Sequence, residues 1–124
     1  MKLTQLALAA GCALSCISPA WSHHAFNMFD GGKYVNVKGT VKEFQWTNPH
    51  AYLLFVVHTP AGATEDWVVE CSSPNIIGRK GWKATSLKPG DNIELTFHPM
   101  KDGSKNALMV SVTTTDGQTL KDKS

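Results

Sequence analysis

The stretch YVNVKGTVKEFQW, residues 34–46, decides the fold, because its apolar residues change sides part of the way along. Side chains of a strand alternate between its two faces, so residues of one parity share a face. The apolar positions are odd in the first half and even in the second: Val35, Val37 and Val41, then Phe44 and Trp46. Such a switch is typical of a β-bulge or of the sharp coil that closes a sheet into a barrel. We predict the bend at Gly39.

Outward from this stretch, alternating Val, Thr and aromatic residues predict four further strands separated by turn residues. These are Ala51–His58, Asp66–Cys71, a strand over 92–97 and a strand over 108–112. The turn Asp116-Gly117 then precedes a short final strand or tail.

One helix is predicted between the third and fourth strands. Ser73 can cap it, and Pro74 suits the first helical position. Ile76 and Ile77 are expected to face the core, and Gly81 to end the helix. Three strands, a short helix and two strands is the order of an OB-like fold. The sequence therefore predicts an all-β domain, a small five-stranded OB-like Greek-key barrel. A small β-sandwich would give similar alternation.

The N-terminal residues 1–22 read as a cleaved secretory signal peptide. A basic residue precedes an apolar stretch that is too short for a membrane span, and small residues follow. Cleavage after Ser22 or after Ala20 satisfies the small-x-small rule. A lipoprotein is the alternative, but Cys12 and Cys16 lack the usual large aliphatic residue three positions earlier. We expect a periplasmic or secreted protein with one domain over 23–120 and a frayed tail over 121–124.

The composition limits the kinds of binding partner that the chain is expected to have. The 124-residue chain has a formal net charge of +2 with both signs scattered, so charge-driven binding of nucleic acid is not expected. Only Cys71 remains in the mature chain, which leaves three readings: a buried small side chain, an intermolecular disulfide or a metal ligand. No phosphate loop, dinucleotide fingerprint or nucleophile elbow is present in the sequence. Glu70 could be a partly buried carboxylate, or could face solvent or pair with Arg79 or Lys80.

The histidines are the candidate metal ligands. After cleavage, His23 and His24 lie at or near a free α-amino group, and an amine beside an imidazole chelates a divalent ion. Nitrogen-rich tetragonal sites favour Cu(II), so a copper ion is the predicted cofactor. His50, which follows a proline turn, or His98, at the end of the fourth strand, could supply a further nitrogen. The alternative is a solvated tail and two polar turn residues.

Several motifs of the chain occur in the same order in a known family. They are His23-His24-Ala25-Phe26, Trp46-Thr47-Asn48-Pro49-His50, Ser73-Pro74-Asn75 and Leu87-Lys88-Pro89-Gly90-Asp91. The chain resembles a family of small exported bacterial proteins classed as a domain of unknown function. The resemblance implies a secreted, mostly periplasmic protein and carries no activity, cofactor or catalytic residue. Because the His-His and Asn-Pro-His motifs recur in that family, His23, His24 and His50 are the preferred site residues.

Three functions are compatible with the sequence. The first is a small periplasmic binding protein, not an enzyme, that takes a copper ion or another small ligand. The second is an interaction module that contacts an envelope protein through an open edge or an aromatic face, with no metal. The third is a copper-dependent redox enzyme. No membrane span is expected in the mature chain.

Overall fold

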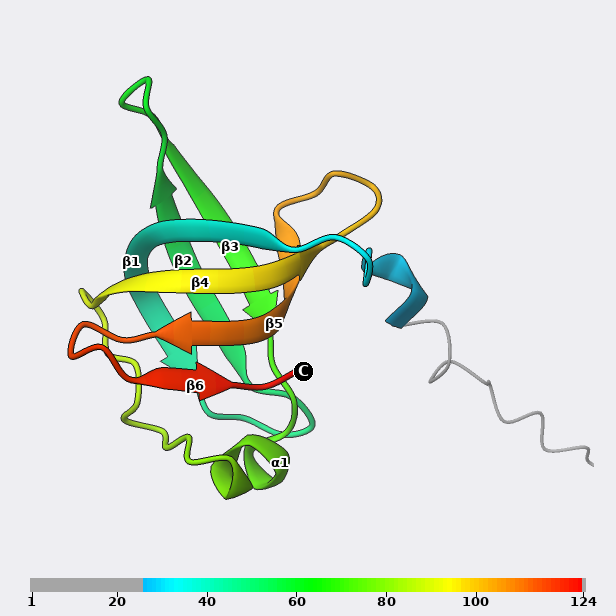
Figure 1. Ribbon diagram of the computed structural model, residues 1–124, viewed down its shortest axis with the longest axis vertical. Coiled ribbons are helices and arrows are strands. Elements are labelled where there is room, and N and C mark those ends of the chain that lie inside the picture. Colours follow the sequence, from blue (N-terminus) through cyan, green and yellow to red (C-terminus); the bar gives the residue numbers. More distant parts are fainter. Residues whose placement is uncertain (1–25, 124) are drawn as a thin grey trace, which may run out of the picture.

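The structure is a computed structural model, and it describes residues 26–123 of the chain. It is an all-β barrel with one short helix, as the sequence predicts (Figure 1). The strands are β1 (Val35–Gln45), β2 (Tyr52–His58), β3 (Thr64–Glu70), β4 (Asn92–Pro99), β5 (Asn106–Thr113) and β6 (Thr119–Lys121). A 3-10 turn, η1 (Phe26–Met28), precedes the barrel, and the helix α1 (Pro74–Arg79) lies between β3 and β4.

The sheet closes through its first long strand. Strand β1 pairs with β2 over one part of its length and with β4 over another, and a parallel pairing between β3 and β5 closes the ring. The predicted bulge exists: the register of β1 against β2 shifts between Val41 and Glu43. The shift lies at Lys42, three residues beyond the predicted position at Gly39. Gly39 has a different role, because a methyl group there would lie 2.2 Å from the Val56 carbonyl oxygen.

The barrel is filled by the inward side chains of every long strand. The largest fully buried ones include Phe55, Leu53, Phe97 and Leu95. Trp82, which follows the helix, is also buried at 2% exposure. At roughly 2 kcal/mol for each fully buried large apolar side chain, these residues supply the main driving force for folding.

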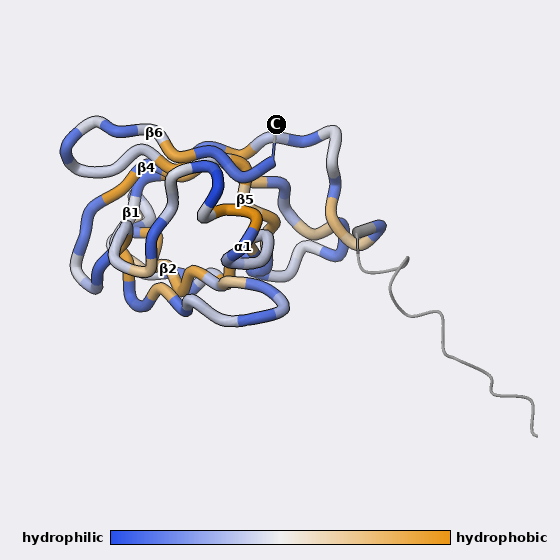
Figure 2. Tube along the Cα trace, turned by 90° about the horizontal axis from the view of Figure 1, so that it is seen from below, coloured by the Kyte–Doolittle hydropathy of each residue, from blue (hydrophilic) through white to orange (hydrophobic). Residues whose placement is uncertain are grey.

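Helix α1 covers the lower end of the barrel. Seen from below, it lies over the centre of the ring of strands (Figure 2). Pro74 takes the first helical position as predicted, but the Ser73 side chain makes no capping hydrogen bond. Ile77 is fully buried, whereas Ile76 is 49% exposed, so only one of the two isoleucines faces the core. A helix of six residues presents too narrow a face to bury two adjacent side chains, because neighbours on a helix point about 100° apart.

The C-terminal residues differ from the predicted frayed tail. Lys121 belongs to β6, and Asp122 is 1% exposed. The Asp122 amide donates to the Val110 carbonyl at 2.8 Å, and the Trp82 indole donates to the Lys121 carbonyl at 3.0 Å. These bonds hold the C-terminal segment against β5 and against the loop after α1. The segment is therefore ordered despite its polar composition. Within residues 26–123, no helix has the length and apolar character to span a bilayer.

Candidate functional site

His50 lies in the loop between β1 and β2, at the end of the barrel that α1 covers. The loop contains a cis Asn48–Pro49 bond, and the Thr47 hydroxyl donates to the His50 carbonyl at 2.8 Å. The imidazole faces the last residue of β3, and its Nδ1 lies 3.0 Å from Oε1 of Glu70. Both side chains are partly exposed, at 35% and 24%. The sequence did not reveal this pair, and Glu70 contacts neither Arg79 nor Lys80 as an ion pair.

The pairing fixes the chemistry of the His50 ring. A carboxylate only accepts hydrogen bonds, so Nδ1 carries the proton and donates to Glu70. In the neutral ring, Nε2 then keeps its lone pair and can bind a metal ion. Metal-binding histidines in proteins commonly have this arrangement, with the second ring nitrogen held by a carboxylate or carbonyl. The partly exposed His50 ring can therefore act as one metal ligand.

Tyr52 extends this cluster. It pairs with Glu70 across β2 and β3, and its ring meets the His50 ring edge-on with centroids 6.5 Å apart. Burial, and then the negative charge of Glu70, raise the pKa of the Tyr52 phenol above its usual value. The phenol therefore remains neutral at physiological pH.

A cavity of about 300 Å³ adjoins His50 and Glu70. Its lining combines hydroxyl, charged and apolar groups: Pro49, His50, Glu70, Cys71, Ser72, Ser73, Ile76, Leu108 and Lys123. Cys71 is 1% exposed, in agreement with the buried reading. Burial, and then the negative charges of Asp122 and Glu70, raise the pKa of the Cys71 thiol far above its usual value. The thiolate form that binds metals and attacks electrophiles is thus suppressed near neutral pH.

Asp122 supports the wall of this cavity. Its Oδ2 accepts a hydrogen bond of 2.7 Å from the Ser72 amide, and the Lys80 ammonium donates to its backbone carbonyl. Its Oδ1 is buried and has no hydrogen-bond partner among the described residues. The residues that we expected to fray therefore position the segment that leads from β3 into α1.

His98 lies in a different environment. Its side chain is on β4, the residue is 8% exposed, and Nδ1 lies 2.8 Å from the Lys33 carbonyl oxygen. The Tyr34 ring packs against it with centroids 4.6 Å apart. His98 thus fixes the chain before β1 to the barrel. His98 and Glu70 both pair with Leu108 of β5, so two strand spacings, roughly 10 Å, separate their backbones.

His23 and His24 lie outside the described residues. The chain that follows them is attached beside the β4–β5 loop, where Met28 accepts a bond of 2.9 Å from Lys101 and Asp30 donates one of 2.8 Å to Pro99. Within residues 26–123, no group of three or more His, Cys, Asp or Glu side chains could hold a metal ion. His50 and Glu70 therefore need ligands from elsewhere to form a metal site.

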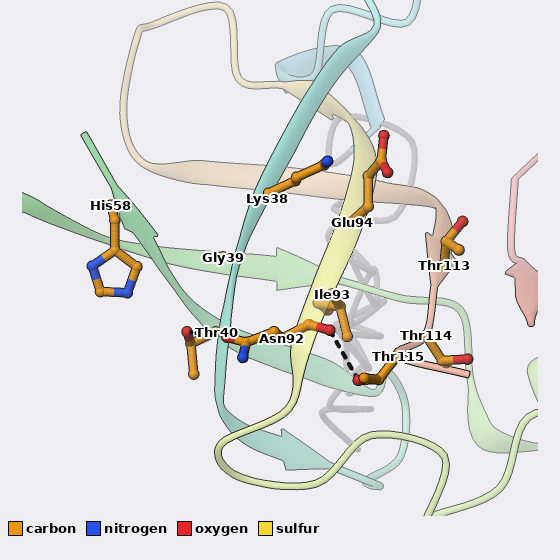
Figure 3. Close-up of a pocket in the computed structure, with 10 residues that line it drawn as sticks. All are labelled: Lys38, Gly39, Thr40, His58, Asn92, Ile93, Glu94, Thr113, Thr114 and Thr115. Carbon is orange, nitrogen blue, oxygen red and sulfur yellow. Dashed lines mark hydrogen bonds between the residues drawn. The ribbon is translucent and has the colours of Figure 1, made fainter. Parts of the chain in front are cut away.

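Another hollow of the surface, about 570 Å³, lies elsewhere, over β1, β4 and the end of β5 (Figure 3). Asn92 connects two of the lining segments: its side-chain oxygen accepts a hydrogen bond of 3.0 Å from Thr40, and its carbonyl accepts one of 3.0 Å from Thr115. Figure 3 shows Lys38 and Glu94 extending to the same side from neighbouring strands, with His58 apart from them. His58 is exposed. This hollow is open and of mixed polarity, and no pair like His50–Glu70 is found among its lining residues.

Comparison with known proteins gives a family and no activity. No curated protein and no solved structure matches this chain. A family model described as a family of unknown function (DUF6152) matches residues 12–110. Because the match covers most of the chain, the protein belongs to this family of unknown function.

Proposed function

We propose that the mature protein is an exported, periplasmic binding protein that takes one Cu(II) ion. The proposed ligands are the α-amino group and imidazoles of His23 and His24, together with Nε2 of His50. This role requires that the signal peptide is removed after Ser22, because only then does the amine lie beside an imidazole. The Glu70–His50 contact of 3.0 Å carries the proposal, since it leaves Nε2 available as a ligand.

The chemistry of the donors favours copper. Imidazole and amine nitrogens that share a plane suit Cu(II), which also has the highest affinity among the divalent first-row ions for a given site. The Cys71 thiol is protonated and buried, so it does not add the soft sulfur that Cu(I) prefers. His98 is a poorer candidate than His50, because the residue is only 8% exposed.

The length of the chain permits the proposed site. Three strand spacings and one two-residue step separate Phe29 from Glu70, which corresponds to roughly 16 Å. Three of the five residues from Phe29 back to His24 form η1, in which each residue rises only about 2 Å, so this backbone segment spans at most about 13 Å. The proposal thus requires the chain before η1 to run toward the β1–β2 loop and the imidazole side chains to bridge the remaining distance.

Calorimetric titration with Cu(II) tests the proposal. Protein that begins at His23 is expected to bind one ion, and both His50→Gln and a single glycine added before His23 should weaken binding. His58→Gln is the matched control, because His58 is exposed and lies at the other end of β2. An absence of uptake at micromolar copper would contradict the proposal, as would equal effects of the His50 and His58 changes.

The position of signal cleavage gives a second discriminating result. Protein that begins at Trp21 has His23 as its third residue, so its amine, two amides and one imidazole can bind Cu(II) without the barrel. In that protein, His50→Gln should leave the affinity unchanged. If His50→Gln also has no effect in protein that begins at His23, the terminal residues bind copper alone and the barrel has no part in it.

A further inference from the structure

Residues 119–123, which we call the C-terminal strap, close one side of the cavity of about 300 Å³. Lys123 lines this cavity, and Oδ2 of Asp122 accepts a hydrogen bond of 2.7 Å from the amide of Ser72, another lining residue. Cys71 also lines the cavity and is buried. Burial raises the pKa of the Cys71 thiol, and the charges of Asp122 and Lys123 also act on it. The strap therefore lies close to the Cys71 sulfur.

Few contacts attach the strap to the barrel. Strand β6 comes last in the strand order and pairs with β5 over three residues (Figure 1). The Trp82 indole donates to the Lys121 carbonyl, and the Lys80 ammonium donates to the Asp122 carbonyl. Leu120 is the one apolar side chain of the strap, and it is buried. A segment with few buried apolar contacts separates from a fold at a lower free energy than global unfolding needs.

The Asp122 side chain opposes the closed position of the strap. Its carboxylate is buried, but only Oδ2 accepts a hydrogen bond, and Oδ1 has no partner among residues 26–123. A buried carboxylate oxygen without a donor has lost its hydration and gained nothing in exchange. Movement of the strap into solvent would hydrate this oxygen. The closed position thus combines one apolar anchor with one uncompensated polar atom.

We infer that the C-terminal strap is a lid, which opens as a unit while the rest of the barrel stays folded. Opening removes Asp122 and Lys123 from the side of the cavity and gives small molecules in solution access to the Cys71 thiol. Because local opening needs less free energy than global unfolding, the open form is a minor state of the native protein. This inference does not depend on copper binding.

Modification of Cys71 by N-ethylmaleimide tests the inference, because Cys71 is the only cysteine in protein that begins at His23. Opening of so short a segment exposes little surface, so the modification rate should hardly change in urea below the unfolding transition. Leu120→Ala removes the apolar anchor and should raise the rate about tenfold or more. Lys80→Ala removes one hydrogen bond to the strap and should raise the rate about threefold or more.

The controls are Phe97→Leu and Lys83→Ala. Phe97 is in the core, and its strand partners are Val35 and Met109, so its replacement weakens the whole barrel and leaves the strap intact. Lys83 is exposed and lies three residues after Lys80. Both control rates should stay within about twofold of the parent rate, because neither change affects local opening of the strap. Circular dichroism establishes that each variant is folded before the rates are measured.

A modification rate that follows global unfolding would overturn the inference. The rate would then rise with urea as steeply as the unfolded fraction, and Phe97→Leu would raise it as Leu120→Ala does. A rate that Leu120→Ala leaves unchanged would overturn the inference as well. Acceleration by Ile77→Ala alone would overturn it in a third way, because α1 and not the strap would then be the part that opens.

Discussion

Replacement of Gly39 by alanine should destabilise the barrel severely. Gly39 pairs with Val57 of β2 and with Ile93 of β4, so both neighbouring strands approach it. A methyl group at this position would lie 2.2 Å from the Val56 carbonyl oxygen and 2.7 Å from Cζ of the Phe55 ring. The carbonyl belongs to the backbone and cannot rotate away, so β2 itself must move.

The magnitude follows from what the shift disrupts. Ordinary contact between a methyl group and a carbonyl oxygen requires a movement of about 1 Å, and overpacking of this kind costs roughly 1–3 kcal/mol. Distortion of the ladder beside Gly39 weakens one or two hydrogen bonds, each worth about 1 kcal/mol. We therefore expect Gly39→Ala to lower the free energy of unfolding by about 2–5 kcal/mol, a large part of a typical total of about 5–15 kcal/mol.

Urea denaturation followed by tryptophan fluorescence measures this loss. Gly78→Ala is the control, because Gly78 is in α1 and the nearest atom to the new methyl group would be 3.9 Å away, on Trp46. That change should stabilise the protein by up to about 1 kcal/mol through helix propensity. If Gly39→Ala stays within about 0.5 kcal/mol of the parent protein, the close approach of β1 and β2 is not what requires glycine.

Three further predictions concern Cys71, Asp122 and Glu70. Burial raises the pKa of the Cys71 thiol, so the folded state favours the protonated form. The free energy of unfolding therefore falls as the pH rises above the unfolded pKa of about 8.5, because the thiol then ionises in the unfolded state. The stability difference between the parent and Cys71→Ala should thus shrink by about 2 kcal/mol between pH 8 and pH 10 in urea titrations, and a constant difference would refute this. Asp122→Ala should cost about 1–3 kcal/mol by leaving the Ser72 amide without its acceptor, whereas the exposed Asp66→Ala should cost under about 1 kcal/mol. Glu70→Gln should weaken Cu(II) binding about 10–100-fold in protein that begins at His23, and an unchanged affinity would show that Glu70 does not orient the ligand.

The barrel could be predicted from the sequence because the alternation of apolar residues can be recognised within a single strand. The switch between Val41 and Phe44 indicated the bulge, and the structure has it at Lys42. The position of the helix could be predicted from Pro74, whose missing amide suits a first helical turn. The role of Gly39 could not, because the approach of Val56 depends on how two strands coil around each other.

The pair His50–Glu70 and the buried Asp122 could not be predicted for a related reason. Glu70 reaches His50 only because the β2–β3 register sets Tyr52 opposite Glu70, and that register depends on the length of the intervening hairpin. Asp122 follows a short strand in a polar segment, which locally resembles a frayed end. Its burial depends on the Ser72 amide, which needs an acceptor where β3 has ended.

The most direct test of the copper proposal is pulsed electron paramagnetic resonance on Cu(II)-loaded protein that begins at His23. This method detects the remote nitrogen of each equatorial imidazole. The proposal predicts three coupled imidazoles, those of His23, His24 and His50, with one lost in His50→Gln and none lost in His58→Gln. A spectrum that is identical in the parent and His50→Gln proteins would contradict the claim that the barrel supplies a copper ligand.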